Sequence, residues 1–114
     1  MALITSTITY YRSTYFPIEV NVTPPDGLTA AEALFTVKEN QYDDSSTDAT
    51  AIIKKDAALV SNAGTIEIEN TDVADTVEPG NYFYSILIRM DNNDVYPFAN
   101  GKFKIIATPT NRET

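Results

Sequence analysis

The sequence predicts an all-β fold in which short antiparallel strands form a sandwich or a barrel. Segments of alternating apolar and polar residues follow one another about every ten residues, a spacing typical of such folds. Turn-forming residues separate these segments, as at Pro79-Gly80 and at residues 91–94 (DNND). No stretch has the apolar period of a long helix, so we expect about seven strands and at most one or two short helical turns.

Two strands are predicted before the first proline-rich break. Residues 3–11 (LITSTITYY) alternate imperfectly but are rich in β-branched and aromatic side chains, which favours a first strand at the edge of a sheet. Residues 16–22 (FPIEVNV) alternate cleanly and form the second strand. Because Pro17 cannot donate a ladder hydrogen bond, this strand also belongs at an edge, or begins at a bulge.

The middle of the chain predicts two more strands around a polar connection. Residues 23–27 (TPPDG) end the second strand, and residues 28–32 (LTAAE) are expected to form a single helical turn. Residues 33–38 (ALFTVK) alternate again and predict a third strand. Residues 40–50 (NQYDDSSTDAT) are polar and acidic, so we expect the most mobile loop there. Residues 51–55 (AIIKK) predict the fourth strand.

The fifth strand carries an acidic outer face. Residues 62–64 (NAG) predict a turn, after which Ile66 and Ile68 alternate with polar residues over 65–69 (TIEIE). Residues 70–78 are expected to contain one helical turn before the next strand.

The last two strands form a hairpin. Residues 82–90 (YFYSILIRM) alternate strictly, with Tyr82 and every second residue after it on the core face. Residues 91–94 predict the hairpin loop, and residues 95–107 (VYPFANGKFKIIA) predict the last strand, with a bulge or kink at Asn100-Gly101. The predicted core comprises Phe16, Ile18, Val20, Phe35, Val37, Ile66, Ile68, Tyr84, Ile86, Ile88, Phe103 and Ile105.

Length and composition limit the classes of protein that the chain can represent. Its 114 residues fit a single domain, 1–114, in which the polar residues 108–114 are expected to form a flexible tail. Cysteine is absent, which excludes disulfides and thiolate metal sites. Histidine is also absent, which removes the commonest general base and the commonest transition-metal ligand. We therefore expect neither cofactor nor metal, and no enzyme.

The net charge of −8 disfavours nucleic acid as a partner, because the surface as a whole repels phosphates. No apolar run is long enough to span a membrane, and the N-terminus lacks the basic start and continuous apolar stretch of a signal peptide. We expect a protein that is made in the cytoplasm or cut from a longer chain.

Two acidic groupings are candidates for chemistry. Glu67 and Glu69 share a strand face and could form a carboxylate pair for glycoside hydrolysis, but outward charges on a strand are ordinary and discourage aggregation at an edge. Acidic residues in the two loops could supply oxygen ligands to calcium, but neither loop matches a calcium-binding pattern, so we interpret them as turn residues. The loop residues concerned are Asp43, Asp44, Asp48, Asp91 and Asp94.

Tyrosines are the residues most suggestive of binding. Tyr10, Tyr11 and Tyr15 cluster around the first predicted turn, and exposed tyrosine is enriched where proteins contact proteins or sugars. We predict an interface at these three residues. Half-buried tyrosines at strand ends are equally ordinary, which leaves a packing role open.

The order of motifs resembles a family of immunoglobulin-like domains in structural proteins of tailed phages and prophages, including the amino-terminal domain of baseplate upper proteins. The resemblance covers nearly the whole chain and is carried by FTVK at 35–38, by EPGNYFY at 78–84 and by GKFKI at 101–105. It implies an immunoglobulin-like antiparallel β-sandwich of about seven strands. These motifs determine the fold, so no active site is carried over.

The resemblance also implies a non-enzymatic tail or baseplate component of the virion that mediates protein–protein assembly. Its expected partners are other virion structural proteins and further copies of itself. The alternative from a different class is a carbohydrate- or cell-surface-binding module on the same fold, since a fold does not fix a function.

Overall fold

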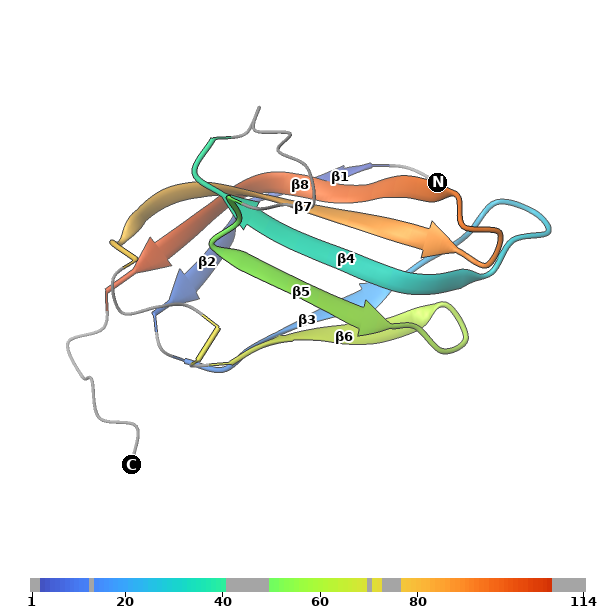
Figure 1. Cartoon of the computed structure of the whole chain (residues 1–114), viewed down its shortest axis with the longest axis horizontal. Coiled ribbons are helices and arrows are strands. Elements are labelled where there is room, and N and C mark those ends of the chain that lie inside the picture. Colours follow the sequence, from blue (N-terminus) through green and yellow to red (C-terminus); the bar gives the residue numbers. More distant parts are fainter. Residues whose placement is uncertain (1–2, 13, 41–49, 70, 73–76, 108–114) are drawn as a thin grey trace.

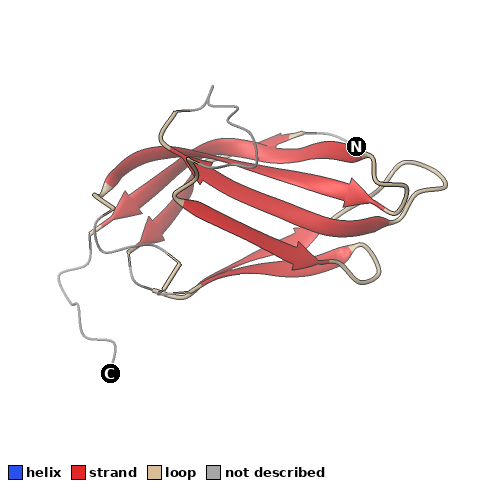
Figure 2. Cartoon of the chain, in the orientation of Figure 1, coloured by secondary structure: helices blue, strands red, loops and turns tan. Residues whose placement is uncertain are grey.

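Figure 1 shows two β-sheets packed face to face in a computed structural model, which describes residues 3–12, 14–40, 50–69, 71–72 and 77–107. The strands are β1 (Ile4–Thr5), β2 (Ile8–Tyr11), β3 (Phe16–Asn21), β4 (Ala30–Lys38), β5 (Ile53–Ala58), β6 (Ala63–Ile68), β7 (Gly80–Met90) and β8 (Val95–Ile106). Strands and loops make up all of the described chain, without a helix (Figure 2). The predicted all-β class is confirmed.

The larger sheet has the order β1-β8-β7-β4-β5, and β2 also pairs with β8. Both β1 and β2 run parallel to β8, whereas the other neighbours are antiparallel. The smaller sheet consists of β3 and β6, paired antiparallel. In the described part of the chain β3 has a partner on one side only, which confirms the edge position predicted from Pro17.

The core lies between the sheets and follows from the alternation of each strand. On β7 every second residue from Tyr82 to Met90 is buried, as predicted. Phe16 and Ile18 are only partly buried and pack at the margin of the core, while the rest of the predicted core is buried. Sequence reasoning did not assign Tyr10, Val22, Ile53 or Leu59 to the core, although all four are buried. Burial of each large apolar side chain contributes about 1.5–3 kcal/mol.

The helical turn predicted at residues 28–32 is wrong. Strand β4 already begins at Ala30, which pairs with Met90 of β7, and the register shifts between Ala30 and Glu32. A single turn gains one hydrogen bond for several fixed residues, whereas β7 offers a complete ladder. The strand therefore extends through this segment and absorbs one extra residue as a bulge.

The bulge predicted at Asn100-Gly101 is also misplaced. The register of β8 shifts between its residues opposite Ile86 and Leu87, which leaves Phe98 without a direct partner on β7. Gly101 lies within β8, and Ser6 crosses it so closely that only glycine fits: a Cβ on Gly101 would lie 1.8 Å from the Ser6 carbonyl oxygen. Ser6 lies between β1 and β2, which together replace the single first strand that was predicted.

The turn between β5 and β6 lies slightly earlier than predicted. Ser61 and Asn62 have φ angles of 53° and 64°, which makes a two-residue hairpin turn that suits the right-handed twist of strands. Residues 41–49 of the predicted mobile loop, most of the predicted helical turn at 70–78 and the predicted tail at 108–114 lie outside the described residues.

Candidate interaction surface

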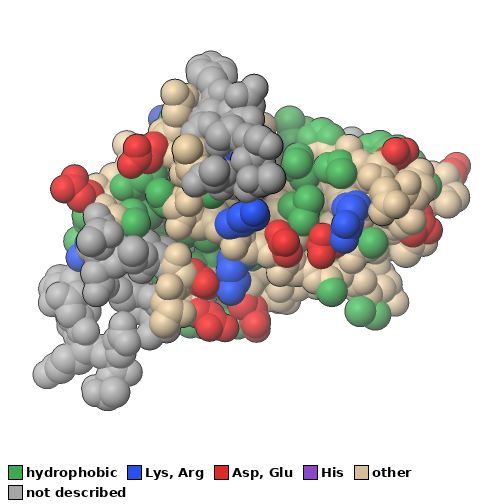
Figure 3. All heavy atoms as spheres, viewed as in Figure 1, with side chains coloured by type: hydrophobic (Ala, Val, Ile, Leu, Met, Phe, Trp, Pro, Cys, Tyr) green, Lys and Arg blue, Asp and Glu red, His purple; other side chains and the backbone are tan. Residues whose placement is uncertain are grey.

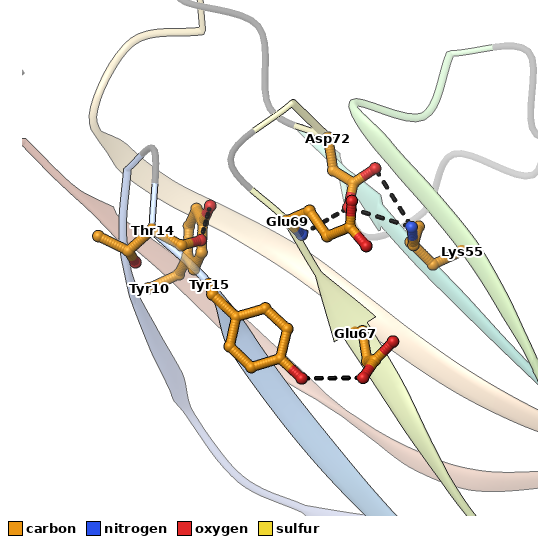
Figure 4. Close-up of polar contacts among 7 residues, drawn as sticks. All are labelled: Tyr10, Thr14, Tyr15, Lys55, Glu67, Glu69 and Asp72. Atoms are coloured by element: carbon orange, nitrogen blue, oxygen red, sulfur yellow. Dashed lines mark hydrogen bonds and ion pairs between the residues drawn. The ribbon is translucent and has the colours of Figure 1, made fainter. Parts of the chain in front are cut away.

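The predicted tyrosine interface lies where the chain crosses from the larger to the smaller sheet, between β2 and β3. The Thr14 hydroxyl donates to the Tyr11 carbonyl at 2.6 Å, and the Tyr10 hydroxyl donates to the Thr14 carbonyl at 2.8 Å. The Arg12 guanidinium donates to the Val77 carbonyl at 3.2 Å, which ties this crossing to the residues before β7. These contacts link the described residues of the crossing to one another and to the residues before β7, and Figure 4 shows the one between Tyr10 and Thr14.

Tyr10 is not available to an interface, which corrects one of the three predicted residues. Its side chain is fully buried, and its ring packs against Phe103 at 5.8 Å and against Phe16 at 6.2 Å between centroids. The Phe103 ring in turn contacts Phe35 at 5.9 Å. Tyr10 thus belongs to an aromatic core row, and its hydroxyl is buried together with a backbone acceptor.

Tyr11 and Tyr15 are exposed, with 54% and 57% of their surfaces accessible to solvent. Tyr15 directly precedes β3, and its hydroxyl donates to Glu67 Oε1 of β6 at 2.9 Å (Figure 4). This hydrogen bond is the main reason that the pKa of Tyr15 is raised, with smaller effects of partial burial and of the charges of Glu67 and Glu69. The exposed pair of tyrosines could contact a protein or a sugar ring.

The acidic residues at the end of β6, Glu67 and Glu69, lie on the outer face of the smaller sheet. Glu67 and Glu69 are both exposed, and Glu67 is engaged by Tyr15. The backbone N–H of Glu69 donates to Asp72 Oδ2 at 2.6 Å, and Lys55 Nζ lies 3.2 Å from the same oxygen (Figure 4). Lys55 occupies an inward-facing position of the edge strand β5, opposite Phe35. A charge at such a position discourages pairing of the edge with another strand, and Asp72 neutralises it.

The β7–β8 hairpin uses its acidic residues for turn formation. The Asp94 N–H donates to Asn92 Oδ1 at 3.0 Å, and Asn92 Nδ2 donates to Asp94 Oδ2 at 3.0 Å. Asn93 has a φ of 71°, in the left-handed region that asparagine tolerates. Throughout the described ranges no group of three acidic residues is placed to hold a metal ion. Asp43, Asp44 and Asp48 lie outside those ranges.

A second surface, the outer face of the larger sheet, was not singled out from the sequence. Figure 3 views this face and shows hydrophobic side chains gathered over β4 and β7, with basic and acidic side chains beside them. Leu87 and Val95 are exposed to 37% and 48%, and Leu34 is paired with Leu87. The sequence did contain one sign of this surface: the outward-facing residues of β7, from Phe83 to Arg89, alternate between apolar and polar. That pattern indicates that another element partly covers Phe83 and Leu87, but it does not reveal which residues of β4 and β8 lie beside them.

The strand order and one tyrosine define the class of this protein. Strands β4, β7 and β8 form the centre of one sheet, with β5 added at one edge, and β3 pairs with β6 in the other; this is the immunoglobulin arrangement with an added edge strand. At the start of β7 the Tyr82 hydroxyl donates to the Glu78 carbonyl at 2.5 Å, four residues upstream, as in the tyrosine corner of such domains. Burial, with the nearby charges of Glu39 and Glu78, raises the pKa of Tyr82. The chain is an immunoglobulin-like β-sandwich.

Comparison with known proteins adds little to this assignment. A chain from a structure of murine CRIg is similar to it with a TM-score of 0.44 and 9% sequence identity, over 90% of this chain and 92% of that chain. No family model matches the sequence, and no curated protein is similar to it. In the described part of the chain there is no helix long and apolar enough to cross a membrane.

Proposed function

We propose that this chain is a non-enzymatic structural protein of a tailed phage or prophage, a tail or baseplate component that acts through protein–protein contacts. It is made in the host cytoplasm and resides in the virion, where other structural proteins and further copies of the chain are its partners. The phage context is supported by the sequence resemblance in the strands around residues 35–38, 78–84 and 101–105.

The observation that carries the assembly role is the exposure of large apolar side chains on the outer face of the larger sheet. Leu87 and Val95 are exposed at regular strand positions, where a polar side chain would serve solubility better. Leu87 pairs with Leu34 on β4 and with Pro97 on β8, and Val95 lies two residues from Pro97 on β8. A contiguous apolar area of this kind, bordered by charged residues, is typical of surfaces that contact other proteins.

Quantitative peptide mass spectrometry on density-purified phage particles from the source strain tests this function. We expect the protein at a fixed number of copies per particle. Absence from particles, combined with abundance in the cell or on its surface, would contradict the virion assignment. A specific hydrolytic activity of the pure protein that is lost in Glu67→Gln would contradict the non-enzymatic role.

The second candidate is a carbohydrate- or cell-surface-binding module, and the exposure of Tyr11 and Tyr15 favours it. Sugar rings stack on exposed aromatic rings, and the two tyrosines flank one crossing of the chain. Calorimetric titration of host cell-wall glycans, with and without calcium, tests this candidate. Binding heat that disappears in Tyr11→Ala and Tyr15→Ala would favour it, and the absence of heat in both conditions would reject it.

A further inference from the structure

The smaller sheet is narrower than the sheet that it covers. Its two strands, β3 and β6, face a sheet of order β1-β8-β7-β4-β5, and neighbouring strands lie only about 4.8 Å apart (Figure 1). On one side β6 contacts β4 and β5, and on the other the ring of Phe16 at the start of β3 packs against Tyr10 of β2. The free edge of β3 therefore faces the side of the sandwich that β2 and β8 form.

Apolar side chains on this side of the sandwich are only half-buried. Ile8 lies on the same face of β2 as the buried Tyr10, and Ile18 is an inward-facing residue of β3. Tyr96 of β8 pairs with the buried Ile88, which places Tyr96 on the inner face of the larger sheet. Ile8, Ile18 and Tyr96 pack against the core but keep part of their surface in water. In the described ranges no further strand lies beside β3 to cover them.

The hydrogen bonds of β3 show which of its backbone groups are free. The Val22 N–H donates to the Asn62 carbonyl at 2.9 Å, and these two residues continue the register between β3 and β6. In an antiparallel pair, residues that exchange hydrogen bonds with the partner strand alternate with residues that do not. The even-numbered residues of β3 therefore bond to β6, and the N–H and carbonyl groups of Glu19 and Asn21 point toward the free edge.

Two other strand edges are obstructed by comparison. On β6 the bridge between Val60 and Ala63 occupies one end of the edge, and the turn closed by Asp72 occupies the other. On β5 the inward-facing Lys55 discourages the addition of a strand. The inward positions of β3 are apolar throughout, and Pro17, which lacks an N–H, limits pairing only at the beginning of the strand.

The charge beside the free edge is negative. Glu19 is exposed in the middle of the open segment. The nearest basic residues along the chain, Arg12 and Lys55, already bond to groups of this protein. An added strand is therefore favoured if the side chains that it turns outward are basic. Residues 14–29 and 59–69, which include both strands of the smaller sheet, contain no lysine or arginine, and their carboxylates are Glu19, Asp26, Glu67 and Glu69.

We infer that the free edge of β3 binds an extended segment of another protein, as an added strand whose side chains alternate between apolar and basic. The apolar side chains pack on Ile8, Ile18 and Tyr96, and the basic ones lie beside Glu19. Within this chain such an alternation occurs at residues 102–105 (KFKI), which are already paired within the larger sheet, so a second copy does not supply the strand. The inference rests on the proposed assembly function and specifies the kind of partner.

The length of the open edge limits the affinity. Pairing is confined to the few residues between Pro17 and the proline pair at 24–25, because neither end can continue the ladder. A strand added over so short a segment buries well under the roughly 1,200 Å² at the lower limit of standard interfaces. We therefore expect a single strand to dissociate in the micromolar range.

Titration of a synthetic peptide with blocked ends, TKVKVKVT, into the full chain labelled with nitrogen-15 tests the inference by NMR in about 150 mM salt. In the free chain the amides of Glu19 and Asn21 should exchange quickly with solvent and that of Val20 slowly. Binding should shift the Glu19 and Asn21 resonances and slow their exchange at least tenfold. TKKKVVVT has the same composition without the alternation, so it controls for attraction of a cation to a chain of charge −8, and it should bind at least tenfold more weakly.

Proline substitutions test the edge itself. Asn21→Pro removes an N–H that faces the free edge and leaves the ladder with β6 intact, so it should weaken binding of TKVKVKVT at least fivefold. Thr65→Pro is the matched control: Thr65 lies opposite Glu19 on β6 and turns its N–H toward the other edge of the same sheet, so binding should stay within twofold. Circular dichroism checks the folding of each variant, and the exchange measurement on the wild type needs neither of them.

Charge reversal tests the basic character of the partner. Glu19→Lys should weaken binding of TKVKVKVT and strengthen binding of TEVEVEVT, each by up to about fivefold, the range of a cross-strand ion pair. Unchanged affinity for both peptides would contradict the assigned place of the basic side chains.

Three other results would overturn the inference: fast exchange at Glu19 and Asn21 that persists at saturating peptide, equal binding of TKVKVKVT and TKKKVVVT, or wild-type binding by Asn21→Pro. Self-association that Asn21→Pro abolishes would also overturn it, because a second copy would then supply the strand. These results are separate from the test of the proposed function. A virion protein that does not bind the alternating peptide would keep its virion role and lose the edge site, and a peptide-binding protein that is absent from particles would do the reverse.

Discussion

Replacement of Gly101 by alanine tests the close crossing of the N-terminal segment over β8. Gly101 has a φ of 152°, and the new Cβ would lie 1.8 Å from the Ser6 carbonyl oxygen and 2.9 Å from its carbonyl carbon. These are backbone atoms, so no side-chain rotation relieves the contact. Ser6 must move away from β8, or β8 must distort.

The expected loss of stability follows from the contacts that hold Ser6. Its N–H donates to the Asn100 carbonyl at 3.1 Å, and its carbonyl accepts from the Tyr84 hydroxyl at 3.0 Å. Losing two hydrogen bonds costs about 0.5–1.5 kcal/mol each, and unfavourable backbone angles add about 1–3 kcal/mol if the residue stays in place. We expect Gly101→Ala to lower the free energy of unfolding by about 2–6 kcal/mol, the sum of these two contributions.

Urea unfolding followed by circular dichroism measures this loss, and hydrogen exchange at the Ser6 amide shows whether the crossing opens. Gly27→Ala is the matched control, because Gly27 has a φ of 82° but no atom within 4 Å of an added Cβ. It should cost only about 1 kcal/mol for its backbone conformation. Equal losses in the two variants would refute the argument that the crossing requires glycine at 101.

Three further predictions concern the tyrosines and the ion pair of β5. Tyr10→Ala should lower the free energy of unfolding by about 3–5 kcal/mol and Tyr11→Ala by less than about 0.5 kcal/mol; similar losses in denaturant unfolding would contradict their opposite burial. The pKa of Tyr15 is raised in the folded state, so its neutral phenol stabilises the fold below pH about 10, and this contribution is lost as pH rises through the raised value. Absorbance at 295 nm should show the Tyr15 pKa falling in Glu67→Gln, and an unchanged titration would reject the hydrogen bond as its main cause. Asp72→Asn should cost about 0.5–1.5 kcal/mol in urea unfolding through its lysine partner, and an unchanged midpoint would remove that ion pair from the stabilising contacts.

Alternation along the chain was sufficient to predict β7 and most of the core, because a strand buries every second residue whatever its neighbours are. Pro17 likewise predicted an edge strand, since the lack of an N–H is a property of the residue itself. The predicted secondary structure was wrong where a local helical preference competed with pairing to a strand that is distant in the sequence. Residues 28–32 carry a weak helical signal, but Met90 pairs with Ala30 and makes the segment a strand.

The two candidate surfaces also differ in how far the sequence alone could predict them. Sequence grouped Tyr10 with Tyr11 and Tyr15 because they are close along the chain, but the sandwich turns Tyr10 between the sheets and the other two outward. The apolar area around Leu34 and Leu87 could not be found from sequence, because these residues become neighbours only through the pairing of β4 with β7.

The sequence by itself determined the all-β class, the alternation that supplies the core, and the lack of histidine and cysteine chemistry. These are properties of residue types and of their local spacing. Only the tertiary structure decided that Gly101 accommodates the Ser6 backbone and that Leu34 and Leu87 lie together on the outer face of the larger sheet. Each of these depends on the register between strands far apart in the chain, and register is fixed by the packing of the whole sandwich rather than by any one segment.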